Sequence, residues 1–290
     1  QGLSIAERAY QQAVGYARER VQGKPVGWSE PGVPPIVHHP DVARLLISMR
    51  ARIEAMRGLL YETAAGVDIS HAHPDANVRA AARRKVDVLV PIAKGWSTET
   101  GCDVTSDGVQ VHGGMGFIEE TGAAQHMRDA RITAIYEGTT AIQSNALVGR
   151  SVLRERGQGV LELFVEIEAV ATEAAGVPAV AATGAALAEA LATAREALAW
   201  LGEAAKEDAR LPFAAGVPFL HLMGLLTGGW MLTRAALAAA AGAGPDEDFR
   251  KARIAIAEIF AGQYLPQVAA RWQTVRASSR AVLAFGEARL

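Results

Sequence analysis

Cysteine is almost absent from this sequence. The single Cys102 excludes an internal disulfide framework and any zinc site built from several cysteines, and it fits a reducing, cytoplasmic setting. Aromatic residues are also scarce, at 6%, although half of the 290 residues are hydrophobic and alanine is abundant. This composition favours closely packed helices over a sandwich or barrel of short strands. We therefore expect an all-α protein.

An excess of basic residues is missing as well. A formal net charge of -2 and a pI near 6.4 predict no nucleic-acid partner. The apolar segment 219–244 is interrupted by His221, by glycines and by Arg234, so we interpret it as a buried helix and expect no membrane span. The first residues are charged and helical, which predicts no signal peptide. The abrupt beginning suggests a chain cut from something longer.

Helical spacing of apolar residues is clear in the first half of the chain. It predicts a helix over 3–22, a Pro- and Gly-rich loop over 23–40, and a second helix up to a polar break at 66–77. The N-cap of the second helix is expected at Asp41 or in the turn just before it. A third helical region from about 78 to 111 contains proline and glycines that should bend or split it, namely Pro91, Gly95 and Gly101.

A last helix of this unit is expected to start near Thr140. The letters "TAIQ" fit a capping box, in which Thr140 caps the Gln143 amide. Four long helices with short connections predict a four-helix bundle over 1–157. Residues 158–290 are richer in alanine and leucine, with breaks at 176–185 and 241–248, and predict an additional helical domain of three or four helices.

Two motifs between helices are candidates for chemistry. "VQVHGGMGF" (109–117) is glycine-rich, but it lacks the Lys-Ser/Thr of a P-loop and the full dinucleotide fingerprint, so a sharp turn between helices and a ligand site both remain open. No G-x-S-x-G elbow accompanies its "HGG", which argues against a hydrolase. The "HAH" of His71 and His73 lacks a nearby acidic or cysteine set, so no metal site is predicted.

Glu137 is the third candidate, in "IYEGTTAIQ" (135–143). A carboxylate just before a helix is stabilised by the positive end of the helix dipole, so it could be a structural helix-end charge. It could also be a base. The residues of this segment alone leave both interpretations open.

Several segments taken together favour the interpretation of Glu137 as a base. "IYEGTTAIQ", preceded by "HMRDARI" and "VQVHGGMGF", resembles the C-terminal helical domain of the acyl-CoA dehydrogenases, and "GLSIAERAYQQAVGYARERVQG" resembles an earlier segment of the same family. The resemblance covers residues 1 to about 156. "PIVHHPDVARLLISMR" and the additional C-terminal region are most similar to the longer branch that includes the 3-methylmercaptopropionyl-CoA dehydrogenases.

This resemblance implies an FAD-dependent oxidoreductase that forms a double bond in a short or modified acyl-CoA thioester. Glu137 then matches the catalytic base, and its neighbours Tyr136 and Gly138 match substrate-binding positions. The base needs a desolvated carboxylate of raised pKa, and the thioester carbonyl needs hydrogen-bond donors, which in the family include the backbone N–H of the glutamate. The remaining matched positions would contact FAD. Arg20, with Gln22 beside it, would reach the cofactor of a neighbouring subunit. Gln110, Gly113 and Gly114 match a glycine-rich turn on the FAD adenosine and pyrophosphate, and Thr139 matches a contact to the phosphates of the flavin.

The resemblance also implies partners. These are an acyl-CoA substrate, an electron-transferring flavoprotein, and further copies of the chain in a homodimer or homotetramer. Gly23 replaces a common phenylalanine of the family and Ala141 an acidic residue or glutamine, which leaves the adenine contacts open but not the base. Since the N-terminal flavin domains of the family are missing, we expect this chain alone to be inactive. The alternative is a non-catalytic helical module for oligomerisation or interaction.

Overall fold

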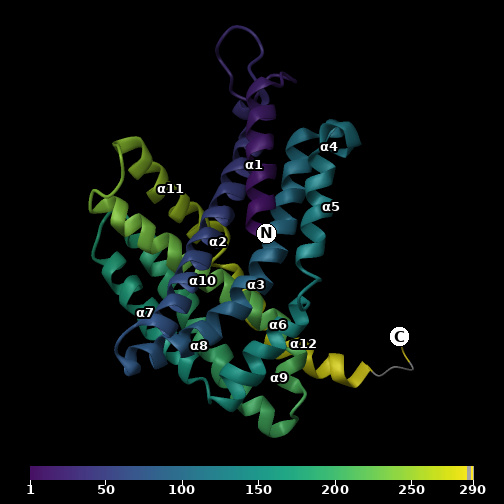
Figure 1. Cartoon of the computed structure of the whole chain (residues 1–290). Coiled ribbons are helices and arrows are strands. Elements are labelled where there is room, and N and C mark those ends of the chain that lie inside the picture. The colour runs from purple at the N-terminus through teal and green to yellow at the C-terminus, as the bar shows by residue number, and fades with distance from the viewer. Residues whose placement is uncertain (286–288, 290) are drawn as a thin grey trace. The chain divides into compact units, whose positions relative to one another are not determined.

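The computed structural model describes residues 1–285 and 289, and these form helices without a β-strand. The all-α prediction is confirmed. The α-helices are α1 (Gly2–Glu19), α2 (Pro40–Ala72), α3 (Ala76–His112), α4 (Gly114–Phe117), α5 (Ala123–Thr133), α6 (Thr140–Ala146), α7 (Gln158–Ala175), α8 (Ala181–Glu207), α9 (Leu211–Ala214), α10 (Gly216–Ala240), α11 (Glu247–Gln263) and α12 (Gln267–Phe285) (Figure 1). Two 3₁₀ turns, η1 (Ile36–His38) and η2 (Glu119–Thr121), and a π-helix, η3 (Leu147–Arg154), complete the elements.

The chain forms two compact units. Unit 1 comprises Gln1–Glu54 and Ser97–Glu137, and unit 2 comprises Ala55–Trp96 and Gly138–Leu290. The boundary falls inside α2 and inside α3, so each of these helices contributes one part to each unit. The division into 1–157 and 158–290 follows composition along the chain rather than these contacts, and it stays a prediction.

Unit 1 is built on close packing of α1 against the second part of α3. A Cβ at Gly101 would lie 3.0 Å from the Gly2 carbonyl oxygen, and further along, a Cβ at Gly108 would lie 3.6 Å from that of Ala9. Beyond these, the rings of Tyr16 and His112 are 4.5 Å apart. The contacts advance together along both helices, so α1 and this part of α3 run parallel.

The helix α5 also packs on α1 (Figure 1), in the opposite direction. Just before α5 begins, the Thr121 carbonyl accepts a 2.6 Å hydrogen bond from the Gln12 side chain. Arg131, near the end of α5, is close enough to Cys102 to influence the pKa of its thiol. Cys102 directly follows Gly101, which packs on Gly2 at the start of α1. The end of α5 is therefore at the end of unit 1 where α1 begins.

Unit 2 is organised around α10, which packs against α7, α8, α11 and α12. Glycines let its neighbours approach: a Cβ at Gly224 would lie 2.1 Å from Trp96, and one at Gly229 would lie 2.6 Å from Leu265. Among the described helices, α10 alone is long and apolar enough to cross a membrane by composition, but 83% of its most apolar window is buried inside the protein. The burial expected for this segment is confirmed.

A charged cluster joins four helices of unit 2. Glu62 of α2 accepts hydrogen bonds of 2.7 Å from both Lys85 of α3 and Arg234 of α10, and Lys85 also reaches Glu166 of α7 at 2.6 Å. Both cations lie over the ring of Trp230, at 5.1 and 5.3 Å from its centroid. Burial alone would raise the pKa of Glu62, but the hydrogen bonds from the two cations lower it below its usual value.

The five tryptophans are unequally divided between the units. Trp28 lies in the loop between α1 and η1 of unit 1, 5.0 Å from the ring of His38. The other four belong to unit 2. Trp96 and Trp230 are buried against α10 or within it, and Trp200 packs edge-on against Trp272 at 6.2 Å.

Several predicted boundaries need correction. The first helix ends at Glu19 rather than residue 22, because Arg20 turns to an extended conformation and its carbonyl accepts a 2.7 Å hydrogen bond from Ile36. The second helix starts at Pro40, so its cap lies in the turn before Asp41, the second of the two predicted positions. The helix extends into the expected polar break and ends at Ala72, so the interruption before α3 is shorter than predicted. Residues 158–285 form six helices, one of them a single turn, instead of three or four.

The third helical region is predicted to bend or split, and the structure shows that it is not split. α3 continues from Ala76 to His112 through Pro91, Gly95 and Gly101. The two glycines serve helix packing, since a Cβ at Gly95 would lie 2.9 Å from Leu220 in unit 2, and Gly101 closes on the Gly2 carbonyl in unit 1. Tertiary contacts therefore outweigh the weak helix propensities of these residues.

Candidate functional site

The segment with Glu137 is a tight turn at the end of unit 1. The N–H groups of Ile135 and Tyr136 both donate to the Ile132 carbonyl, at 3.0 and 3.1 Å, after α5 ends. Glu137 then takes a left-handed conformation with φ of 54°, which is rare for a residue with a side chain. Its side chain is exposed, as is that of Tyr136. The described residues of this chain therefore do not supply the burial that a catalytic base requires.

The next residues begin unit 2 and are held by their own contacts. Gly138 also has a positive φ, 95°, and its carbonyl accepts a 2.6 Å hydrogen bond from the Lys94 ammonium group of α3. Thr139 is the N-cap of α6, because its hydroxyl accepts the N–H of Ile142 at 3.4 Å. The capping box predicted at Thr140 and Gln143 is thus wrong by one residue, since Thr140 already lies inside the helix and is buried.

A second group of predicted site residues lies at the ends of α1 and α3. Arg20 and Gln22 are exposed, and the Arg20 guanidinium donates to the Gln22 side chain at 3.2 Å. Gln110 is exposed in the last turn of α3, where its carbonyl accepts the N–H of Gly113 at 3.0 Å. A Cβ at Gly113 or at Gly114 would meet nothing within 4 Å, and Gly113 has a φ of 60°.

Buried neighbours fix this glycine turn. The His112 ring is buried, with Nδ1 2.7 Å from the Gly108 carbonyl, and it packs against Tyr16. A Cβ at Gly116 would lie only 2.3 Å from the Val109 carbonyl oxygen, so α4 can fold back on α3 only with glycine there. His112 is therefore a structural residue of the turn.

Within unit 1 the predicted residues form two separate groups. Because α1 and α3 run parallel, the group of Arg20, Gln22, Gln110, Gly113 and Gly114 lies at the end where both helices finish. Tyr136 and Glu137 follow α5, which runs the other way. The 11 residues of α5 are about 16 Å long. The two groups therefore lie at opposite ends of unit 1.

The first group suits the pyrophosphate of a dinucleotide. The Arg20 guanidinium and the Gln22 and Gln110 amides are exposed donors, and the open glycine backbone lets a ligand approach closely. These residues of the chain fit FAD. Among the described residues no three His, Cys, Asp or Glu side chains gather in a way that could hold a metal ion.

The other candidate nucleophiles and ligands have structural explanations. His73 accepts the backbone N–H of Asp75 at 3.1 Å in the loop between α2 and α3, and His71 is exposed at the end of α2. Burial raises the pKa of the Cys102 thiol, so at neutral pH it is protonated and a poor nucleophile.

The sequence interpretation overlooked Lys94. It lies 44 residues before Gly138, yet it fixes the carbonyl next to the proposed base. The only signal in the sequence is a lone lysine within the apolar stretch "VLVPIAKGW".

Comparison with known proteins gives the family. Residues 1–153 match the domain described as "Acyl-CoA dehydrogenase, C-terminal domain", and residues 163–286 match "Acetyl-CoA dehydrogenase C-terminal like". The first match covers more than half of the sequence. The chain belongs to the acyl-CoA dehydrogenase family, as the resemblance of its motifs predicted.

Two relatives match nearly the whole chain. The 3-methylmercaptopropionyl-CoA dehydrogenase of Ruegeria pomeroyi is 47% identical over 93% of this chain and 46% of that protein. The broad-specificity linear acyl-CoA dehydrogenase FadE5 of Mycobacterium tuberculosis is 30% identical over 99% of this chain and 49% of that protein. The chain spans about half the length of the curated relatives that it matches.

Solved structures agree on the fold. An acyl-CoA dehydrogenase from Bacillus anthracis, in complex with FAD, superposes with a TM-score of 0.73 at 20% identity, over 98% of this chain and 49% of that one. Caenorhabditis elegans ACDH-11, in complex with C11-CoA, gives a TM-score of 0.69 at 18% identity, over 95% of this chain and 45% of that one. The helical arrangement is therefore that of acyl-CoA dehydrogenases.

Proposed function

We propose that this chain is the C-terminal part of an FAD-dependent acyl-CoA dehydrogenase with Glu137 as the catalytic base. The observation that most supports this proposal is the strained turn, in which Glu137 has a φ of 54° and the following Gly138 has a φ of 95°. Lys94 and the Thr139 cap hold the residues after it. Such strain costs about 1–3 kcal/mol and is concentrated at functional sites.

In the proposed reaction the Glu137 carboxylate removes a proton from the α-carbon of the thioester. A hydride leaves the β-carbon, so that one C–H bond breaks at each carbon and a double bond forms between them. FAD, when bound, accepts the hydride. The backbone N–H of Glu137 and the residues beside it, Tyr136 and Gly138, position the thioester carbonyl, where charge develops as the proton departs.

The separation of the two groups in unit 1 supports different tasks for them. Arg20, Gln22, Gln110, Gly113 and Gly114 bind the FAD of a neighbouring subunit, since α5 separates them from Glu137. Thr139 contacts the phosphates of the FAD that serves its own Glu137. The active enzyme is then a homodimer or homotetramer, and an electron-transferring flavoprotein reoxidises it. Because Glu137 is exposed here, the flavin domains outside this chain supply its burial, and the chain alone is inactive.

The substrate proposal rests on the 47% identical relative, which is named for 3-methylmercaptopropionyl-CoA. A short or modified acyl-CoA of that kind is the proposed substrate. The full-length, FAD-loaded protein is titrated anaerobically with 3-methylmercaptopropionyl-CoA, butyryl-CoA and octanoyl-CoA, while the visible absorbance of the flavin is followed. We expect at least one thioester to bleach the flavin.

The decisive variant is Glu137→Gln, which keeps the shape of the side chain without a basic carboxylate. Bleaching should slow by about 10³-fold or more, with FAD content unchanged. Glu120→Gln is the matched control, since Glu120 is an exposed glutamate of the same unit, and it should bleach normally. Bleaching at the wild-type rate by Glu137→Gln would refute the base.

A second candidate function is a non-catalytic helical module for oligomerisation. The exposed side chain of Glu137 favours it, because a helix-end charge would look the same. In that case none of the thioesters would bleach the flavin of the FAD-loaded protein.

A further inference from the structure

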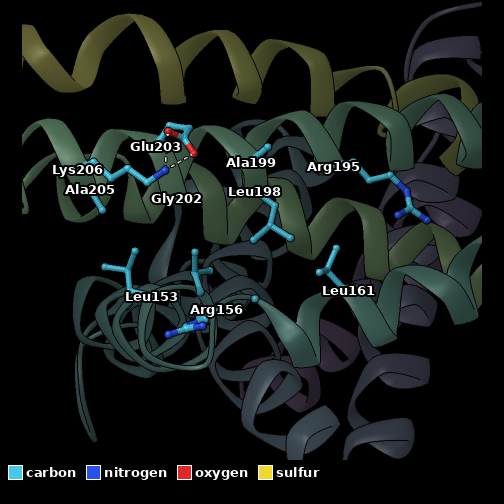
Figure 2. A pocket seen from close by; sticks show the side chains of 12 residues that line it. Leu153, Arg156, Leu161, Arg195, Leu198, Ala199, Gly202, Glu203, Ala205 and Lys206 are labelled. Carbon is cyan, nitrogen blue, oxygen red and sulfur yellow. Dashed lines mark hydrogen bonds and ion pairs between the residues drawn. The ribbon is translucent and has the colours of Figure 1, made fainter.

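Unit 2 contains a cavity of about 580 Å³ between η3, α7 and α8 (Figure 2). Small-molecule sites commonly have about 300–1,000 Å³. In Figure 2, the side chain of Leu198 of α8 points toward η3 and α7, where Leu153 and Leu161 lie. Its walls are mostly apolar and include Val152, Leu153, Leu161, Leu198 and Ala199. None of the residues proposed to bind FAD or the thioester lines it.

The rim of this cavity carries three cationic side chains, and two are neutralised. Arg195 forms an ion pair with Glu168 at 2.9 Å. Lys206 forms one with Glu203 at 2.7 Å (Figure 2). Arg156 makes no side-chain hydrogen bond or ion pair within residues 1–285 and 289. The rim therefore has one uncompensated positive charge beside an apolar hollow.

The backbone at this arginine is unusual. Arg156 has a φ of 54°, and the following Gly157 has 72°, so two successive residues are left-handed. Glycine would adopt this conformation without strain, yet the sequence has arginine at the first position. The neighbouring Glu155 also acts electrostatically on Arg84 of α3, and no ion pair joins it to Arg156 among the described residues. The strained position thus presents a cation to the cavity.

The wall of the cavity that α8 forms contains a glycine that no close helix contact requires. Gly202 lies well inside α8, where glycine weakens a helix relative to alanine. A Cβ there would meet nothing within 4 Å. The effect of glycine at this position is to leave the cavity unfilled.

We propose that this cavity binds a small amphipathic anion. Its apolar body lies against Leu153, Leu161 and Leu198, and a single carboxylate pairs with the guanidinium of Arg156. A guanidinium matches a carboxylate with two parallel hydrogen bonds, and the apolar walls strengthen that pair. The ligand carries no coenzyme A, since the rim offers only one unpaired cation for a negative charge.

Decanoate is the probe for this site. Isothermal titration calorimetry of the full-length protein should show saturable binding at one site per chain. Decyltrimethylammonium, which has the same chain and the opposite charge, should bind at least about tenfold more weakly, because Arg156 repels it. Decanol separates the contribution of the apolar body from that of the charge. Absence of saturable decanoate binding would overturn the proposal.

Two variants test the two halves of the site. Arg156→Gly keeps the left-handed backbone and should weaken decanoate binding about tenfold, with little change for decanol. Gly202→Leu fills the open wall and should abolish binding of both. Gly262→Leu on α11 is the matched control, since a Cβ there also meets nothing within 4 Å, and it should bind like wild type.

Wild-type affinity for decanoate in both Arg156→Gly and Gly202→Leu would contradict the assignment. Sedimentation velocity of the same variants gives an independent check. If Gly202→Leu lowered the oligomeric state of the protein, the cavity would be a surface covered by a second copy, and the small-molecule proposal would be wrong.

Discussion

At the scale of single residues, Glu62 shows how one half-buried carboxylate links several helices. It accepts hydrogen bonds from Lys85 and Arg234, which both lie over Trp230. Because the pKa of Glu62 is lowered in the folded protein, ionisation of this carboxyl group favours the folded state over the unfolded chain. The resulting stabilisation is present above the usual value near 4.5 and is lost as the pH falls through the folded-state pKa.

Replacing Glu62 by glutamine tests this linkage. We expect Glu62→Gln to lower the free energy of unfolding by about 1–2 kcal/mol at pH 7, between the values for exposed and buried ion pairs. The difference in Tm between variant and wild type should shrink as the pH is lowered from 5 towards 3 in calorimetric scans. Glu173→Gln, on an exposed position of α7, should leave Tm unchanged. A difference independent of pH would show that the charge is not responsible.

Candidate site residues could be predicted from the sequence where they stand together in a contiguous motif. "IYEGTTAIQ" and "VQVHGGMGF" could be recognised because their residues are adjacent. Lys94 and Arg156 could not, since their importance depends on a carbonyl 44 residues away and on a backbone angle, respectively. The roles assigned to Glu137 and to the FAD group stay predictions until the flavin experiment is done.

At the scale of elements, the helices were predictable from apolar spacing, but their breaks were not. Gly95 and Gly101 looked like helix breakers in the sequence, whereas each one lets a neighbouring helix approach closely within its own unit. The cap of α6 was missed by one residue because two threonines stand side by side, and either hydroxyl could serve. Local sequence gives the propensity, while packing decides where a helix ends.

The glycines of α10 give a prediction at this scale. Gly224→Ala would place a Cβ 2.1 Å from Trp96, so we expect a loss of stability of about 1–3 kcal/mol or more from overpacking. Gly202→Ala is the contrasting change in α8, where the new Cβ meets open space, and it should stabilise the protein by roughly 0.5–1 kcal/mol. Urea unfolding of both variants measures the difference. Equal stabilities would show that α10 and Trp96 are not tightly packed.

At the scale of the whole molecule, chain order and spatial order differ. The N-terminal part of α3 belongs to unit 2, where Val88 and Arg84 contact Gly159 and Glu162 of α7, and Trp96 packs on Gly224. Composition along the chain changes near residue 157, but it carries no information about which distant segments share a core. A division at 157 would therefore separate groups that are packed together in unit 2.

Truncation tests this consequence. A chain ending at Gly157 would expose Val88 and Trp96, which are buried in the full chain and lie against Gly159 and Gly224. We expect it to lose cooperative unfolding in calorimetry and to be cleaved by protease within 55–96, while the full chain resists under the same conditions. A cooperative transition within a few degrees of the full chain would contradict this expectation.

The unequal distribution of tryptophan provides a natural optical label. Only Trp28 belongs to unit 1, and the four others lie in unit 2. In a Trp28→Phe protein, the tryptophan emission would therefore come from unit 2 alone, whereas far-ultraviolet ellipticity would report the helices of both units. Divergence of the two signals during unfolding would reveal that one unit melts before the other, without any added dye or engineered probe.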